Sequence, residues 1–239
     1  MKFVMVPGGW HGGWVFDAVA AELRRAGHQV EAVTLAGLEP DGPADADRPP
    51  NLDTHIDQVA AIVDGSAVEP LALCGHSYGG MVIAGVADRL GHRLDQLVFI
   101  DAYVPEDGDS CWSLTSDHFR ELFVAGSRAD GRWVAVPDRF DPRARAHPLA
   151  SFLQSVRLGG GPGHGFGRTY ISGGAWLGNP FVALTERLRE DSDWRVHEIP
   201  VGHDIARRDP SGLAAVLDAL PAAGGRRSVG RAARALDTD

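Results

Sequence analysis

The stretch LALCGHSYGGMVIAG, residues 71–85, decides the fold of this 239-residue chain. Residues 70–74 form an apolar run that predicts a buried strand, and residues 81–90 have the apolar spacing of a helix. Between them, GHSYG fits the pattern G-x-S-x-G, in which a sharp strand-to-helix turn exposes a serine hydroxyl. Glycine also suits a plain, closely packed turn. The strand and helix on either side favour a nucleophilic serine, Ser77.

Strand and helix patterns alternate on both sides of this motif. The predicted strands cover residues 2–6, 29–34, 70–74, 96–100, 168–172 and 194–199. The predicted helices cover residues 15–26, 52–63, 81–90, 180–189 and 210–220. The last two begin at Asn-Pro and Asp-Pro pairs, in which a capping side chain precedes a proline. The alternation predicts an α/β fold with a mostly parallel, doubly wound sheet.

The alternation breaks at residues 102–167, which have short mixed patterns and end in the glycine-rich run LGGGPGHGFG. We therefore predict a core of residues 1–101 and 168–223, with a lid of residues 102–167 inserted between two strands of the sheet. The glycines and prolines of the lid predict hinges that let it move. Residues 224–239 are predicted to form a flexible C-terminal tail.

The composition limits the classes of partner. Apolar residues make up 44% of the chain, which is enough for a sizeable core, and the net charge is −9. A surface that follows phosphates would be basic, so we expect no nucleic-acid partner. No apolar run approaches a membrane span and no secretory leader is recognisable, so we expect a cytoplasmic protein that acts on a small molecule. Its two cysteines make neither a disulfide framework nor a metal cluster, and no cofactor or metal is implied. The oligomeric state stays open.

A serine hydroxyl is a weak nucleophile until a base accepts its proton. His203, in VGHD, follows the last predicted strand and precedes the last predicted helix, where such a base would be placed. The other histidines that we considered lie on early elements, in the lid, or inside the serine motif pointing away from the serine, and we expect surface or structural roles for them: His28, His55, His76, His118, His147 and His164.

A tetrahedral oxyanion needs backbone N–H donors. One is expected from Tyr78, the residue after the serine, and the second from the loop VPGGWHGGW, residues 6–14. The glycines of this loop allow close approach to a ligand. A phosphate-binding loop is the alternative interpretation, but neither G-x-G-x-x-G nor a phosphate-binding lysine is present.

Three segments together resemble a known family. FVMVPGGWHGGWVFDAVAAELRRAGHQVEAVTLAGL, LCGHSYGGMVIAG and VGHD are similar to the branch of the α/β-hydrolase superfamily that contains plant methyl esterases, plant hydroxynitrile lyases and many bacterial esterases. The resemblance covers the sheet elements and implies the α/β-hydrolase fold. It implies Ser77 as nucleophile, His203 as base, and Gly9 and Tyr78 as the oxyanion donors. Pro7 stands where the family usually has histidine.

The third member of the triad departs from that pattern. Plant members take their acid from the loop after the strand at residues 168–172, but TYISGGAWLGN, residues 169–179, contains no acid, and Trp176 stands near the expected place. Other members of the fold place the carboxylate one strand earlier, which here gives Asp101. Parallel strands bring Asp101 and Ser77 to the same edge of the sheet. A turn-capping role for Asp101 stays open, as do four rival acids: Glu106, Asp107, Asp109 and Asp204.

We therefore predict a serine hydrolase that cleaves a carboxylic ester of a small or medium-sized apolar molecule through an acyl-enzyme. Trp10, Trp112 and Trp176 are expected to shape an apolar substrate pocket. The plant lyases use a lysine after the histidine and a threonine in the oxyanion loop; Asp204 and Gly8 occupy those positions, which disfavours a lyase of that type. A biosynthetic cyclase, another non-hydrolytic enzyme or a receptor-like ligand-binding protein on the same fold stays open.

Overall fold

The structure is a computed structural model that describes residues 1–42, 47–160, 165–174 and 176–221. The predicted tail, residues 224–239, lies outside the described residues, as does part of the glycine-rich run at the end of the predicted lid.

Six parallel strands form the central sheet in the order β2-β1-β3-β4-β7-β8. Their bounds are β1 Lys2–Val6, β2 Gln29–Ala32, β3 Leu71–His76, β4 Gln96–Ile100, β7 Gly167–Ser172 and β8 Trp194–Glu198. The chain winds from β1 to one edge and then returns to place β3 on the other side of β1. Ligands of open α/β sheets bind at such a switch point, outside the carboxyl ends of the strands. The doubly wound parallel sheet predicted from the alternation is confirmed.

Helices cover both faces because successive strand side chains point to opposite sides. Val4 and Val6 of β1 pack with α2 and α3, whereas Phe3 and Met5 pack with α1 and α9. Contacts between α2 and α3 hold one layer together, and contacts between α1 and α9 hold the other. The helix bounds are η1 Gly13–Phe16, α1 Asp17–Arg25, α2 Leu52–Asp64, α3 Gly79–Leu90, η2 Gly91–Arg93, α7 Val182–Glu190, α8 Ile205–Arg208 and α9 Pro210–Asp218.

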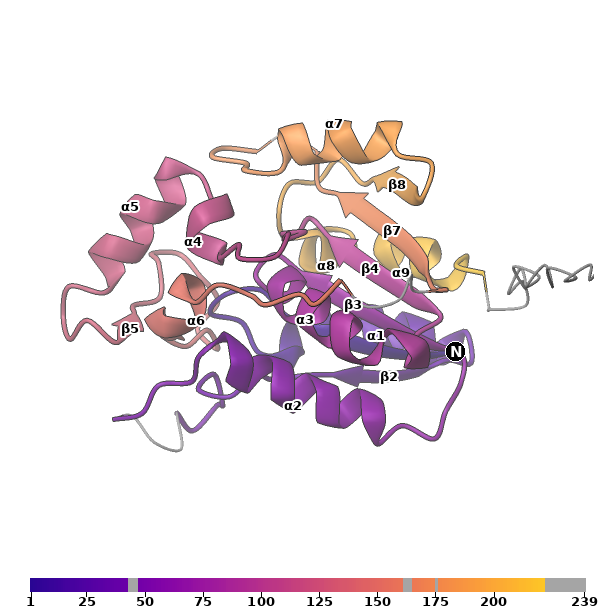
Figure 1. The fold of residues 1–239 in the computed structure, drawn as a ribbon, viewed down its shortest axis with the longest axis horizontal. Coiled ribbons are helices and arrows are strands. Elements are labelled where there is room, and N and C mark those ends of the chain that lie inside the picture. The colour runs from indigo at the N-terminus through magenta and orange to yellow at the C-terminus, as the bar shows by residue number, and fades with distance from the viewer. Residues whose placement is uncertain (43–46, 161–164, 175, 222–239) are drawn as a thin grey trace, which may run out of the picture.

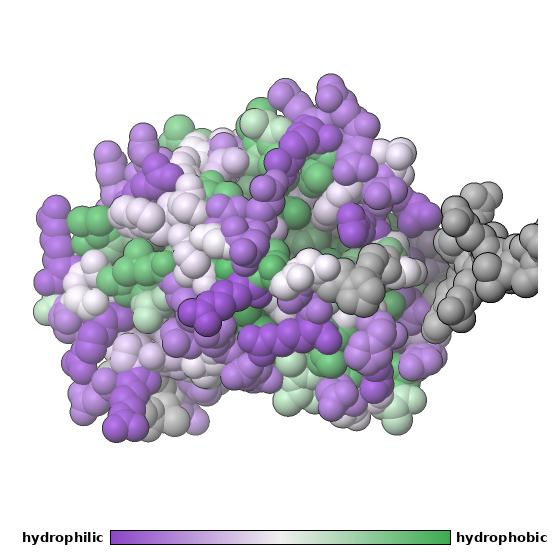
Figure 2. Space-filling model, viewed as in Figure 1, coloured by the Kyte–Doolittle hydropathy of each residue, from purple (hydrophilic) through white to green (hydrophobic). Residues whose placement is uncertain are grey.

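The segment between β4 and β7 forms a separate group of short elements, although β4 and β7 themselves pair in register. It contains α4 Cys111–Leu114, α5 Asp117–Gly126, β5 Trp133–Val134, β6 His147–Pro148 and α6 Leu149–Leu153. Figure 1 shows these elements gathered beyond the end of the sheet toward which the β4 and β7 arrows point. Figure 2 shows a mainly hydrophilic surface with hydrophobic side chains over this group. We call the segment the lid.

Several predicted boundaries differ from the structure by a few residues, and two of these differences have clear local reasons. The strand before Ser77 continues through Gly75 and His76, because β3 stays paired with β4 up to the turn. Helix α7 begins at Val182 rather than at Pro180, since the Asn179 side chain accepts from the Phe181 N–H across a turn before the helix. Asp209 does cap α9, by accepting from the Gly212 N–H.

Among the residues that the structure describes, no helix combines the length and the apolar character needed to cross a membrane.

Candidate active site

Ser77 lies in the turn between β3 and α3 with a φ of 53°, a left-handed conformation that is uncommon outside glycine. The surrounding glycines have no room for side chains. A Cβ at Gly75 would lie 2.6 Å from the Gly79 carbonyl oxygen, and a Cβ at Gly79 would lie 2.6 Å from the Val6 carbonyl oxygen. The turn is therefore pressed against the end of β1, which fixes the direction of the serine.

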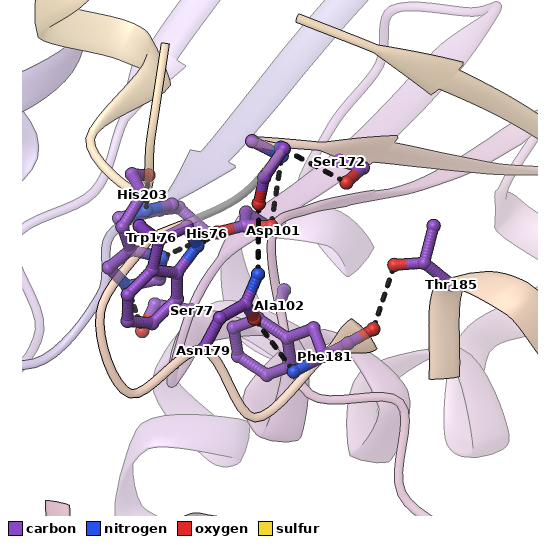
Figure 3. A network of polar contacts seen from close by, with 12 residues as sticks. His76, Ser77, Asp101, Ala102, Ser172, Trp176, Asn179, Phe181, Thr185 and His203 are labelled. Atoms are coloured by element: carbon purple, nitrogen blue, oxygen red, sulfur yellow. Dashed lines mark hydrogen bonds and ion pairs between the residues drawn. The ribbon is translucent and has the colours of Figure 1, made fainter. Parts of the chain in front are cut away.

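Three side chains from three different loops form a chain of hydrogen bonds (Figure 3). His203 Nε2 lies 3.0 Å from Ser77 Oγ, and His203 Nδ1 lies 2.7 Å from Asp101 Oδ2. Ser77 follows β3, Asp101 follows β4 and His203 follows β8. These residues meet because the carboxyl ends of parallel strands share one edge of the sheet.

The Asp101 carboxylate is fully buried and accepts from three donors. Besides His203, the Gly173 backbone N–H donates to Oδ1 at 2.9 Å and the Trp176 indole N–H donates to Oδ2 at 2.9 Å. A Cβ at Gly173 would lie 2.5 Å from the Gly202 carbonyl oxygen and 3.1 Å from Asp101 Oδ2, so a side chain there would displace the carboxylate. The acid-free stretch at residues 169–179 thus supplies donors to a carboxylate that follows the neighbouring strand, β4.

The four rival acids make other contacts. Glu106 pairs with Arg187, Asp107 accepts from the Leu158 N–H, and Asp109 accepts from the Glu106 N–H. Asp204 pairs with Arg207 at 3.4 Å. Within the described parts of the chain, none of these four acids is hydrogen-bonded to His203, whereas Asp101 is.

The loop after β1 packs against the serine. A Cβ at Gly8 would lie 2.9 Å from Ser77 Cβ, so the backbone of this loop is in contact with the turn. Across the described residues, no hydrogen bond uses the backbone N–H of Gly9 or of Tyr78, whereas the Trp10 N–H donates to His147 Nδ1. Gly9 lines the adjacent cavity; the Tyr78 side chain is buried away from it, with its hydroxyl 2.8 Å from His55 Nδ1.

A cavity of about 720 Å³ opens beside Ser77 and His203. Its aromatic lining comes from the loop after β1, the lid and the β7–α7 loop: Trp10, Phe119, Phe140 and Trp176. Charged side chains line it as well: Arg139, Asp204, Arg207 and Arg208. Of the three predicted pocket tryptophans, Trp10 and Trp176 line the cavity. Trp112 does not, because it packs half-buried against the hydrophobic core.

Three histidines that line the cavity were not predicted as site residues: His11, His76 and His118. His76 lies beside His203, with ring centroids 4.6 Å apart, and its Nε2–H donates to the His203 carbonyl oxygen at 2.9 Å. Burial lowers the pKa of His76 well below its usual value, with repulsion from His203 and His11 adding to the effect. The His11 Nδ1–H donates to the Gly9 carbonyl oxygen at 2.8 Å, and burial likewise lowers its pKa. Only tertiary contacts distinguish these histidines from surface ones.

The described residues contain no group of three or more His, Cys, Asp or Glu side chains that could hold a metal ion. Cys74 and Cys111 are both buried and unpaired, and burial raises the pKa of the Cys111 thiol to about 12.

A family model described as the alpha/beta hydrolase family matches residues 3–223. This chain is 34% identical to the carbendazim hydrolyzing esterase of Nocardioides sp. (strain SG-4G), with 92% of this chain and 99% of that protein covered. It is 32% identical to the alpha-hydroxynitrile lyase of Arabidopsis thaliana over 44% of this chain and 40% of that one. An extracellular alpha/beta-hydrolase from a Paenibacillus species has a similar fold, with a TM-score of 0.74, 21% identity and coverage of 91% and 97%.

The match over nearly the whole sheet shows that this chain belongs to the alpha/beta hydrolase family. The predicted fold and family are therefore confirmed. Relatives named as an esterase and as a lyase both match this chain, so membership of the family leaves the reaction to be argued from the site.

Proposed function

We propose that the protein is a serine hydrolase that cleaves carboxylic esters through an acyl-enzyme, with Ser77, His203 and Asp101 as its triad. The observation that carries the proposal is the continuous chain of hydrogen bonds from Ser77 Oγ through both nitrogens of His203 to the buried Asp101 carboxylate. The relative named as an esterase, 34% identical over 92% of this chain, supports ester hydrolysis.

The geometry supports a role for each residue of the proposed triad. Asp101 accepts the His203 Nδ1–H, which leaves Nε2 free to take the proton of Ser77. Ser77 Oγ bonds to the acyl carbon, and the carbonyl π electrons move to oxygen, where the backbone N–H groups of Gly9 and Tyr78 would stabilise them. His203 then protonates the departing alkoxide. Water, deprotonated by His203, cleaves the acyl-enzyme by the reverse sequence and restores the serine.

The cavity favours a small or medium-sized apolar ester. Its volume of about 720 Å³ is within the range of pockets that hold drug-sized molecules. Two apolar residues at its lining are solvent-exposed, Leu177 at 87% and Phe140 at 36%, which gives an apolar substrate an apolar entrance.

Cyanide-releasing lyase chemistry of the plant type is disfavoured. Asp204 lines the cavity where those lyases have lysine, and a carboxylate repels a cyanide anion. Gly8 replaces their threonine and provides no hydroxyl.

The test is burst kinetics with 4-nitrophenyl butyrate, together with labelling by a serine-directed fluorophosphonate. We expect a burst of nitrophenol equivalent to one per active site and a covalent adduct on Ser77. The Ser77→Ala variant should fold normally and lose about 10⁶ in kcat, as removal of a triad nucleophile does. A labelled residue other than Ser77, or turnover retained in Ser77→Ala, would contradict the covalent mechanism.

A further inference from the structure

His147, a lid residue on β6, contacts the loop that follows β1. Its Nδ1 accepts the backbone N–H of Trp10 at 3.2 Å, across 137 positions of sequence. Its side chain is fully buried, and its ring stacks on Phe152 with centroids 4.1 Å apart. None of the roles proposed above uses this residue.

The hydrogen bonds around His147 define its tautomer. Because the Trp10 N–H donates to Nδ1, the ring proton is on Nε2. Nε2 lies 2.9 Å from Ser151 Oγ, and the Ser151 hydroxyl donates to the Pro148 carbonyl oxygen at 2.8 Å. Ser151 Oγ therefore accepts from His147, and each of these polar groups has a partner. Burial holds the pKa of His147 well below its usual value, which keeps the acceptor nitrogen unprotonated at neutral pH.

The same peptide unit is held at its other end. The His11 Nδ1–H donates to the Gly9 carbonyl oxygen at 2.8 Å, so one histidine binds the C=O and another binds the N–H of the Gly9–Trp10 peptide. We call this pair of contacts the histidine clamp. The lid holds the remainder of Trp10 too: the Arg145 N–H donates to its carbonyl oxygen at 3.0 Å, and its indole N–H donates to the Val134 and Ala135 carbonyl oxygens at 3.1 Å.

The clamp opposes a specific relaxation. Trp10 has a φ of 65°, which is unfavourable for a residue with a bulky side chain. Rotation of the Gly9–Trp10 peptide plane would bring Trp10 to a negative φ, and Gly9 would not resist because it has no Cβ. That rotation turns the Gly9 carbonyl and frees the carboxyl side of Gly9, whose N–H belongs to the preceding Gly8–Gly9 peptide and is then anchored from one side alone. It also breaks both bonds of the clamp.

His147 also contacts the second segment of the oxyanion hole. Its ring lies edge-to-face on the Tyr78 ring, with centroids 4.9 Å apart and planes at 76°. The two backbone segments that supply the proposed donors therefore meet the same buried imidazole.

We infer that His147 is a positioning residue of the oxyanion hole: by accepting the Trp10 N–H, it fixes the Gly9–Trp10 peptide and so anchors Gly9, whose N–H is the proposed donor to the reacting oxygen. The inference rests on the proposed function. It assigns to the lid a part in the chemical step, in addition to covering the cavity.

A pair of variants with matched shape isolates the hydrogen bond. In His147→Asn the amide oxygen can replace Nδ1 as the acceptor of the Trp10 N–H. The leucine of His147→Leu has nearly the same shape as that asparagine but offers no acceptor. Both lose the Ser151 contact and the stacking on Phe152. Tyr103→Phe is the control for loss of a buried hydrogen bond elsewhere, since it removes the contact with Thr115 and leaves the loop after β1 untouched.

We expect His147→Leu to lower kcat by about 10- to 100-fold with KM within twofold of the native value, because a small displacement of an oxyanion donor acts on the transition state. The inhibition constant of an alkyl trifluoromethyl ketone should rise in parallel, since its adduct with Ser77 places an oxyanion in the hole. His147→Asn should stay within about threefold of native kcat, and Tyr103→Phe should lower the melting temperature without changing kcat.

Equal kcat in His147→Leu and His147→Asn would overturn the inference, as would a rise in KM at constant kcat. Exchange of the Trp10 amide hydrogen provides a readout that does not depend on turnover. It should be faster in His147→Leu than in native protein and His147→Asn, and unchanged exchange would show that the bond does not hold the peptide. Failure of the proposed function would be visible in the native protein itself, as absence of nitrophenol release and of fluorophosphonate labelling at Ser77.

Discussion

Two residues of the proposed triad have backbone conformations that are costly for their type. Ser77 has a φ of 53° and Asp101 a φ of 42°. Such conformations cost about 1–3 kcal/mol each and persist only where the surroundings hold them. Here the glycines around Ser77 and the three donors to Asp101 provide those surroundings.

The assignment of Asp101 leads to a direct test. Asp101→Asn should lower kcat by about 10⁴, because an amide can donate to His203 and favour the wrong tautomer. Steady-state kinetics and circular dichroism would separate this effect from unfolding. Asp107→Asn is the control, since Asp107 accepts from the Leu158 N–H and lies outside the proposed triad. If Asp101→Asn kept near-native kcat and Asp204→Asn lost it, the acid would be Asp204.

The Trp176 indole is expected to contribute to catalysis through Asp101. Trp176→Phe removes the indole donor to Asp101 Oδ2. It keeps an aromatic ring beside His203, because the Trp176 and His203 ring centroids lie 4.5 Å apart in the native protein. We expect kcat to fall about 10- to 100-fold, which corresponds to the loss of about 1.5–3 kcal/mol from one hydrogen bond to a charged group. Trp112→Phe makes the same chemical change outside the cavity and should leave kcat unchanged. Similar kcat values for the two variants would argue against the role of the indole.

At the level of elements, the sheet could be predicted because its signal is local. The strand predicted at residues 96–100 matches β4, and residues 2–6 match β1, since each is a short buried apolar run. The lid elements α4, α5, β5, β6 and α6 were not predicted individually. They are short, and contacts far along the chain stabilise them, such as the bond from Trp10 to His147. The donors from Gly173 and Trp176 to Asp101 were missed for the same reason.

The lid should exchange amide hydrogens faster than the sheet, but not evenly. Helix α5 buries only Phe123, so its amides should be the least protected of the lid. The β5–β6 pair is held to Trp10 and should exchange more slowly than α5. The central strands β3 and β4 are buried throughout and should be the slowest. Hydrogen exchange read by mass spectrometry would measure this order, and uniform protection across lid and sheet would contradict it.

At the scale of the whole molecule, the topology brings the proposed site together. Residues that follow β1, β3, β4 and β8 meet at one edge because every strand of the sheet is parallel. The alternation of patterns was sufficient to predict that edge, and therefore the neighbourhood of Ser77, Asp101 and His203. It could not predict which polar groups would be buried behind the edge, because burial depends on how the lid packs. His55 and His147, both fully buried, are the clearest cases.

The burial of His55 should make global stability depend on pH. Its ring bridges the Tyr78 hydroxyl and the Ala36 carbonyl oxygen, and burial lowers its pKa from 6.5 to about 4. Between those values the unfolded chain binds a proton that the folded protein does not, so stability is complete above pH 6.5 and is lost as the pH falls toward 4. From pH 7.5 to pH 5, this histidine should cost about 2 kcal/mol of unfolding free energy. Urea unfolding at both pH values would measure the loss.

The control variant is His55→Gln, which cannot titrate. It should be less stable than the native protein at pH 7.5, but on acidification it should lose about 2 kcal/mol less unfolding free energy than the native protein does. An identical loss in both proteins would show that His55 is not the group responsible.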